Sequence, residues 1–158
     1  MLSQSLVREA LGIALSTGAD YAEVFAEHTN QKAIQMVSAK VDKIEDAVIA
    51  GVGIRIFKGT RCISGSASSL ERGAVLSCAR KVADALVGSS MIADVVLRER
   101  RFGDIHPVKV VPASVENNMK VGFLREACLA AKNYHEDIAQ VTGTFLDVDH
   151  NIMIATSE

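Results

Sequence analysis

Residues 50–68, AGVGIRIFKGTRCISGSAS, come closest to a ligand-binding motif in this chain. Gly51 and Gly53 could begin a G-x-G-x-x-G loop, which holds a pyrophosphate at the N-terminus of a helix. The third glycine is absent, because the position is occupied by Ile56. Apolar and polar residues then alternate as in a strand, and Lys58-Gly59-Thr60 interrupts the alternation. The pattern predicts a β-hairpin with a glycine turn, not a nucleotide site.

The glycine pair then needs a backbone explanation. Glycine inside a strand weakens it, unless the backbone needs a positive φ or another segment passes close by. We therefore expect Gly53 to occupy a position that a side chain cannot share. On this interpretation a larger residue at that position lowers the stability of the fold.

The side chains that could bind a metal are scattered along the sequence. No histidine has a histidine partner three or four residues away, and the cysteines form no C-x-x-C pair. The segment that begins at His135-Glu136 has Gln140 where a second histidine would be needed. Residues 147–151, DVDHN, lack the glycine and the distal glutamate of a calcium loop. We predict no metal-ligating residue among the histidines and cysteines, which are His28, His106, His135, His150, Cys62, Cys78 and Cys128.

Nucleophilic catalysis is equally poorly supported. The sequence has no G-x-S-x-G motif, and the hydroxyl-rich stretch from Ser64 to Ser69 has no neighbouring histidine to act as a base. Glu23 and Glu27 are expected on the solvated face of a strand. The sequence thus predicts no catalytic and no cofactor-binding residue in this chain.

Three helices are expected from apolar residues at helical spacing. The first begins at a cap on Ser3 or Ser5 and ends near Gly18, and the second runs from a cap on Ser69 to Gly88. The third begins near Ser114. Its predicted buried face consists of Met119, Phe123, Ala127, Ala130, Ala131 and Tyr134.

The strands are expected between these helices and after them. One strand begins near residue 21, and two short strands lie around Ile34–Val37 and Lys40–Glu45. The hairpin of residues 48–67 follows. Two final strands, Ile138–Leu146 and Ile152–Thr156, are expected to join at a turn in DVDHN.

The order of these elements predicts the fold class. Strands occur in runs instead of alternating singly with helices, which favours an α+β fold. We expect an antiparallel meander with helices packed mainly on one face, in a single domain over residues 1–158. Residues 89–113 hold both prolines and are expected to form an irregular connection within it.

Composition limits the partners. The chain has 158 residues, 49% of them apolar, and no tryptophan, so it can form an aliphatic core. Its net charge of −2 argues against direct nucleic-acid binding, which usually requires a basic surface. No apolar run is long enough to cross a membrane. Three widely spaced cysteines are typical of reduced thiols in a cytoplasmic protein.

Four stretches together resemble the N-terminal domain of the TldD/PmbA family, whose members are also described as modulators of DNA gyrase. They are GADYAEVFAEHT, KVDKIEDAVIAGVGIRIFKGTRCISGSASSL, ARKVADAL and VGFLREACLAAKNYHEDIAQVTGTFLDVDHNIMIATSE. The resemblance extends over nearly the whole chain. It depends on the order and spacing of ordinary residues, and the style of the sequence is closer to the TldD branch.

The resemblance implies a cytoplasmic two-domain protein of nearly three times this length. TldD-type members are zinc metallopeptidases with an HExxxH motif, and their N-terminal domain helps to enclose a peptide channel and contributes to dimer contacts. The zinc ligands would lie beyond Glu158, so no catalytic residue is carried over and the chain is expected to be a fragment. The implied partners are an extended or unfolded peptide and a second TldD/PmbA-type subunit, in a homodimer or heterodimer.

Two further functions stay open. PmbA-type members lack HExxxH and serve as non-catalytic partner subunits, and a gyrase-associated regulator is the third alternative. A full-length protein with HExxxH would be a zinc metallopeptidase, whereas one without it would be a partner subunit.

Overall fold

The structure is a computed structural model that describes residues 1–86, 95–100 and 106–158. Its elements follow the order helix, three strands, helix, helix and strand, with a short 3₁₀ helix at Pro112–Ser114. The helices and strands are α1 (Gln4–Leu15), β1 (Tyr21–Val37), β2 (Lys40–Lys58), β3 (Arg61–Ala67), α2 (Arg72–Asp84), α3 (Asn117–Lys132) and β4 (Thr142–Thr156).

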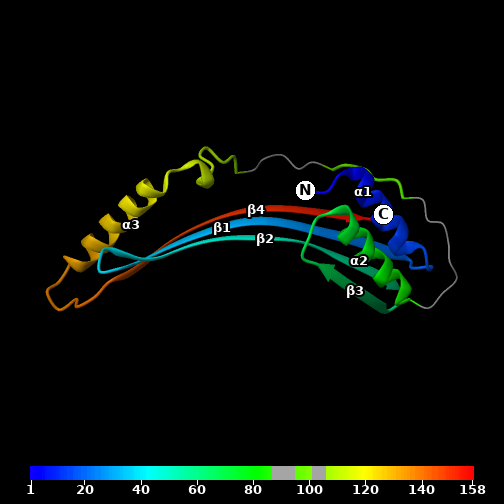
Figure 1. The fold of residues 1–158 in the computed structure, drawn as a ribbon, viewed down its shortest axis with the longest axis horizontal. Coiled ribbons are helices and arrows are strands. Elements are labelled where there is room, and N and C mark those ends of the chain that lie inside the picture. Colours follow the sequence, from blue (N-terminus) through cyan, green and yellow to red (C-terminus); the bar gives the residue numbers. More distant parts are fainter. Residues whose placement is uncertain (87–94, 101–105) are drawn as a thin grey trace. The chain divides into compact units, whose positions relative to one another are not determined.

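The strands form one antiparallel sheet in the order β3-β2-β1-β4, which can be followed in Figure 1. β2 and β3 pair from Lys58↔Arg61 to Val52↔Ala67. β4 runs antiparallel to β1, because Ser38 N–H donates to the Val141 carbonyl at one end and Ser157 N–H to the Ala22 carbonyl at the other. The expected α+β fold with an antiparallel meander is confirmed.

The chain forms two compact units. Unit 1 comprises Met1–His28, Ile49–Phe102 and Asn151–Glu158, and unit 2 comprises Thr29–Val48 and Gly103–His150. The single domain expected over residues 1–158 stays a prediction. The irregular connection expected over 89–113 lies partly outside the described residues, and its segments 95–100 and 106–111 contain no helix or strand.

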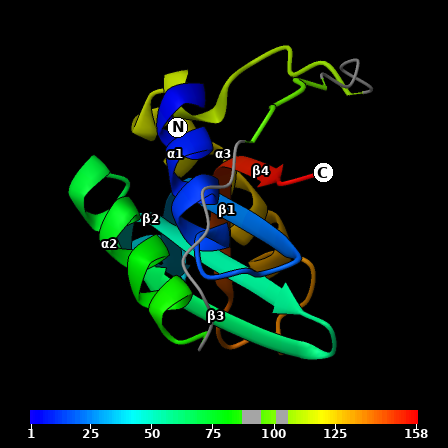
Figure 2. The ribbon, with the colours of Figure 1, turned by 90° about the vertical axis from the view of Figure 1, so that its right-hand side faces the viewer.

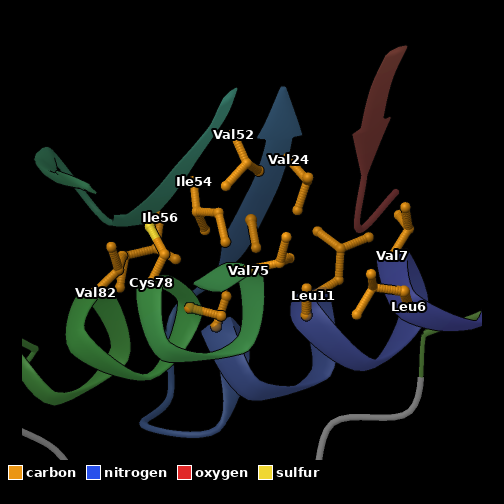
Figure 3. Close-up of a cluster of buried hydrophobic side chains, with 14 of the residues drawn as sticks. Leu6, Val7, Leu11, Val24, Val52, Ile54, Ile56, Val75, Cys78 and Val82 are labelled. Atoms are coloured by element: carbon orange, nitrogen blue, oxygen red, sulfur yellow. The ribbon is translucent and has the colours of Figure 1, made fainter. Parts of the chain in front are cut away.

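Unit 1 has an aliphatic core between two helices and one face of its part of the sheet. α1 and α2 lie side by side in Figures 1 and 2. Of the two predicted caps of α1, Ser3 and Ser5, the structure has Ser3, since its Oγ accepts a hydrogen bond from Leu6 N–H at 3.3 Å. Alternate residues of β1 and β2 point at the helices in Figure 3. The buried side chains drawn there include Val24, Val52, Ile54 and Ile56 from the sheet and Leu6, Val7, Leu11, Val75, Cys78 and Val82 from the helices.

Unit 2 has a smaller core under α3. Ile34 and Met36 of β1 are fully buried and pack against Leu124 and Cys128 of α3. Phe145 of β4 packs against the same cluster. None of the helices in the described residues is long and apolar enough to cross a membrane.

The predicted face of α3 is wrong. Met119 is 56% exposed and Phe123 60% exposed, whereas the buried positions of the helix are Lys120, Leu124 and Cys128. The prediction failed because it excluded a face that contains a lysine. Tyr134, 86% exposed, lies beyond the end of the helix.

The predicted ends of the other helices also need correction. α2 begins after Glu71, and Ser69 Oγ instead accepts a hydrogen bond from Glu71 N–H at 3.1 Å, before the helix. α3 begins three residues after Ser114, which belongs to the 3₁₀ helix. Gly88, the expected stop of the second helix, lies outside the described residues.

The strands are longer than predicted. The separate strands expected near residue 21 and around Ile34–Val37 are one strand, β1. Lys40–Glu45 and the first arm of the hairpin likewise form the single strand β2. The turn expected at DVDHN is wrong, because those residues continue β4. Polar residues suggested breaks, but they lie at exposed or half-buried positions where a paired strand accepts them.

The β2–β3 hairpin has the glycine turn that the sequence predicts. Gly59 has φ +54°, in the region that glycine adopts readily. Asp20 supports the turn, since its carboxylate accepts hydrogen bonds from Lys58 Nζ and from Gly59 N–H, each at 2.8 Å. These two hydrogen bonds hold the pKa of the Asp20 carboxyl below its usual value.

The β1–β2 turn has an unusual pair of residues. Ser38 and Ala39 have φ values of 47° and 60°, the pattern of a type I′ turn. Residues other than glycine and asparagine reach this region at a cost. Ser38 N–H donates to the Val141 carbonyl, and Arg125 Nε donates to the Ala39 carbonyl. These contacts hold the turn against its own backbone preference.

The expected role of Gly53 is wrong. A Cβ at Gly53 would meet no atom within 4 Å, and its φ is not in the left-handed region. A Cβ at Gly51 would lie 2.9 Å from the Ala67 carbonyl oxygen. Gly51 is crowded because the pairing of β2 with β3 ends at Val52↔Ala67, one residue away from Gly51. At this point β3 leaves the sheet.

We predict opposite outcomes for the two glycines. Gly51→Ala should lower the free energy of unfolding by about 1–3 kcal/mol, because its new methyl group meets backbone that cannot rotate away. Gly53→Ala is the matched control and should change it by less than about 0.5 kcal/mol. Urea unfolding followed by circular dichroism measures both. Equal effects of the two substitutions would contradict the assignment.

We also predict that the β1–β2 turn can be improved. Replacing Ser38-Ala39 by Asn-Gly should raise the free energy of unfolding by about 1–2 kcal/mol, because this pair favours a type I′ turn. Ser38→Ala keeps the Cβ and should give no such gain. A thermal melt in which Asn-Gly lowers the melting temperature would show that the turn is unstrained.

Candidate functional site

The four histidines belong to four different segments. His28 lies in β1 and His150 in β4, whereas His106 and His135 lie in exposed segments outside the helices and strands. Among the described residues, no three His, Cys, Asp or Glu side chains are placed to hold a metal ion. The described part of the chain therefore does not fit a zinc site.

The hydroxyl-rich stretch lies on β3 and the connection that follows it. Ser64 pairs with Arg55 and Ser66 with Gly53 across the β2–β3 hairpin. Ser69 bonds to backbone, as described above. Nearby, Glu23 accepts a hydrogen bond from Arg55 at 2.9 Å, so this carboxylate is paired with a cation. Residues 50–68 thus contribute to the β2–β3 hairpin and to the connection that follows it.

One hollow in the described part of the chain belongs to unit 2. A groove of about 470 Å³ lies between α3, β4 and the segment before α3. Its lining residues are Val110, Pro112, Val115, Lys120, Phe123, Phe145, Leu146, Asp147 and Val148. Most of these side chains are apolar, and four of them are consecutive residues of β4. Successive side chains of a strand point to opposite faces, so the groove follows the edge of β4 and not one of its faces.

One ion pair lies within this apolar lining. Lys120 Nζ and Asp147 Oδ2 are 2.6 Å apart, and the two side chains are only 3% and 14% exposed. A buried charge is strongly unfavourable unless it is paired. The pair therefore neutralises two charges that would otherwise be stranded in the core of unit 2.

A second lysine, Lys32, is paired near the N-terminal end of α3. Lys32 Nζ on β1 lies 3.2 Å from Asp46 Oδ2 on β2 and 3.4 Å from Asn117 Oδ1 on α3. The charges of Lys32 and Lys120 are thus both compensated. The groove consequently offers mainly apolar contact, and its charged residues Lys120 and Asp147 are paired with each other.

Sequence reasoning missed this groove. Lys120 lies at the helical spacing of Leu124 and Cys128, so the spacing could have placed it on the buried face. Its partner Asp147 is 27 residues away, in a segment interpreted as a turn. Only pairing of β4 with β1 brings the two charges together.

The part of the chain that contains the hairpin matches a known protein family. Residues 22–86 match the model of the PmbA/TldA metallopeptidase domain 1. The match extends from the start of β1 to just beyond α2, and so includes the hairpin of the opening motif. Residues 22–86 are thus similar to the first domain of the PmbA/TldD family. The resemblance inferred from the sequence is confirmed. A comparison with curated proteins gives no match.

Solved structures share the fold of this chain. A proposed modulator of DNA gyrase from Bacteroides thetaiotaomicron matches 99% of the chain at 18% identity with a TM-score of 0.74. A proposed modulator of a DNA gyrase from Thermotoga maritima matches 97% at 15% identity with a TM-score of 0.67. TldE from Thermococcus kodakarensis matches 96% at 14% identity with a TM-score of 0.58. The chain spans 38%, 35% and 34% of these three proteins, respectively.

We predict that Lys120 and Asp147 stabilise unit 2 only as a pair. Lys120→Met should lower the free energy of unfolding by about 3–5 kcal/mol, because it leaves the Asp147 carboxylate buried without a partner. Lys120→Met combined with Asp147→Leu should recover most of the loss. Chemical denaturation measures both variants.

An exposed ion pair provides the control for this prediction. Lys43 and Glu45 lie 2.6 Å apart with side chains 57% and 58% exposed, so Lys43→Ala should cost less than about 0.5 kcal/mol. A loss in Lys120→Met no larger than that in Lys43→Ala would show that the burial of the pair has no energetic consequence.

Proposed function

We propose that this chain is the N-terminal domain of a TldD/PmbA-like zinc metallopeptidase of the cytoplasm. In this proposal the domain helps to enclose a channel for extended peptides and contributes to dimer contacts, while another domain carries the zinc ion and the catalytic groups. The observation that carries the proposal is the match of residues 22–86 to the first domain of a metallopeptidase family. The described residues lack a metal-ligand cluster, which supports placing the zinc site elsewhere.

The relative lengths support a division of labour between domains. The solved relatives are far longer than this chain, which spans 38% or less of each. The shared fold accounts for only a minor part of these longer proteins. We therefore expect it to be combined with a second domain. The TldE structure among these relatives supports a TldD/PmbA-type subunit as the partner.

A non-catalytic role is the second candidate. TldE gives its name to one of the similar structures, and two others are described as proposed modulators of DNA gyrase. These names favour a PmbA-type partner subunit or a gyrase-associated regulator. The net charge of −2 gives no support for direct contact with DNA. An HExxxH motif in the same polypeptide would distinguish the peptidase from the partner subunit.

We predict that the purified chain binds an unfolded peptide without cleaving it. A fluorescently labelled, reduced and alkylated peptide should show increased anisotropy with the chain, because the proposed role is to position an extended substrate. Mass spectrometry should recover the peptide intact after prolonged incubation. Cleavage should require added TldD-type subunit and should stop with a chelator, since the proposed catalytic metal is supplied there.

Two results would overturn this function. Absence of peptide binding at high chain concentration would remove the channel role. Chelator-sensitive cleavage by the chain alone, or one tightly held zinc ion per chain in metal analysis, would place the active site within these residues. Bovine serum albumin in place of the chain controls for non-specific binding of the labelled peptide.

A further inference from the structure

The buried ion pair of unit 2 has hydrogen-bonding capacity that the protein does not use. Lys120 Nζ and Asp147 Oδ2 lie 2.6 Å apart, and within the described residues neither side chain bonds to a second residue. An ammonium group has three donors, and a carboxylate has about four acceptor sites. Even a two-fold contact between the two groups therefore leaves a donor on Lys120 and acceptor sites on Asp147 unused. A buried ion pair is favourable only when further hydrogen bonds satisfy such groups.

Both charged groups lie in the wall of the groove of about 470 Å³. Sites for small molecules typically have volumes of about 300–1,000 Å³, apolar walls and a few converging polar groups. The groove has this composition, because all its lining residues other than Lys120 and Asp147 are apolar. Every lining residue belongs to unit 2, so the groove lies within one compact unit.

The two adjacent charges favour a ligand that carries two adjacent charges of its own. A ligand carboxylate can accept a hydrogen bond from Lys120, but the nearby Asp147 carboxylate would repel it. An ammonium group on the same ligand removes this repulsion, because it can donate to Asp147. A free α-amino acid carries both groups on one carbon atom. The C-terminal residue of a peptide carries only the carboxylate, since its nitrogen belongs to an uncharged amide.

The apolar wall favours a ligand with a large apolar side chain. Phe123 of α3 and Phe145 of β4 both line the groove, and Phe123 is 60% exposed, so a ligand can reach its ring. Aromatic rings attract other rings beyond the effect of buried area alone. Leu146 and Val148 add aliphatic contact. A polar side chain would lose its hydrogen bonds to water against this wall.

We propose that the groove of unit 2 is a binding site for a free α-amino acid with a large apolar side chain. In this site Lys120 binds the carboxylate, Asp147 binds the ammonium group, and the apolar wall with Phe123 covers the side chain. The inference goes beyond the proposed function and does not depend on it, because every binding group belongs to the described residues of unit 2.

Isothermal titration calorimetry of the 158-residue chain with L-phenylalanine tests the site. The titration should saturate with a Kd of about 1 mM or tighter. Hydrocinnamate lacks the ammonium group and phenethylamine lacks the carboxylate, so each should bind at least about tenfold more weakly, because one charge of the pair then stays unmatched. L-Alanine keeps both charges but lacks the large side chain, and it should also bind at least about tenfold more weakly. Failure of L-phenylalanine to saturate the chain by about 10 mM, or equal binding of hydrocinnamate, would overturn the proposal.

N-Acetyl-L-phenylalanine distinguishes a free amino acid from the end of a peptide. It keeps the carboxylate and the aromatic side chain, but its nitrogen is an uncharged amide, as in a C-terminal residue. It should bind at least about tenfold more weakly than L-phenylalanine, because it brings a second carboxylate to the pair without an ammonium group. Equal binding of the two compounds would show that the groove accepts a peptide terminus, and the assignment to a free amino acid would be wrong.

Substitutions test the residues of the site. Lys120→Met combined with Asp147→Leu removes both charges and should abolish saturation, and circular dichroism checks that this variant is folded. Phe123→Ala changes an exposed position and should weaken binding of L-phenylalanine at least about fivefold. Lys43→Ala and Tyr134→Ala are the matched controls, because they remove an exposed charge and an exposed ring outside the groove, and both should bind as the wild type does. Wild-type affinity in Phe123→Ala or in the folded double variant would contradict the proposed site.

Peptide binding by the same chain separates this inference from the proposed function. A chain that binds L-phenylalanine but no unfolded peptide supports the amino-acid site and contradicts the channel role. A chain that binds unfolded peptide but not L-phenylalanine contradicts the amino-acid site alone.

Discussion

Close approach of helix side chains to strand backbone is the constraint on which both cores depend. A Cβ at Gly65 of β3 would lie 2.8 Å from Val82 Cγ2, and a Cβ at Gly143 of β4 would lie 2.8 Å from Cys128 Sγ. At both positions a glycine gives the helix the space that a side chain would take. The cores that result are thin and aliphatic, in agreement with an aromatic content of only 4%.

Small side chains on the central strand serve the same packing. Ala22 and Ala26 of β1 are fully buried beside Val24, so α1 and α2 can lie close to the sheet. β1 is hydrogen-bonded to β2 on one side and to β4 on the other, whereas β3 pairs with β2. The consequence for function is that the chemically distinctive residues in the described part of the chain serve to hold strands and turns.

Local patterns predicted the elements but not their limits. Helical periodicity predicted α1 and α2, and the glycine turn predicted the β2–β3 hairpin. Each of these patterns consists of residues that are close to one another in the sequence. The short strands predicted on either side of residues 28–33 are one strand in the structure, since pairing on both sides overrides weak local propensity. The face of α3 was misassigned for a similar reason. Burial of Lys120 depends on Asp147, which no local pattern connects to it.

The sequence by itself determined the fold class, the antiparallel hairpin, a cap of the first helix at Ser3 or Ser5 and the resemblance of residues 22–86 to the PmbA/TldD family. Each of these features follows from the order and spacing of residues that are close in the sequence. Only the tertiary structure decided that Gly51 and not Gly53 is crowded, because the Ala67 carbonyl oxygen that crowds it belongs to another strand. Tertiary structure likewise decided that a lysine faces the core and that the apolar residues of β4 face outward. A side chain's environment depends on residues distant in the chain, and a sequence pattern records only the near ones.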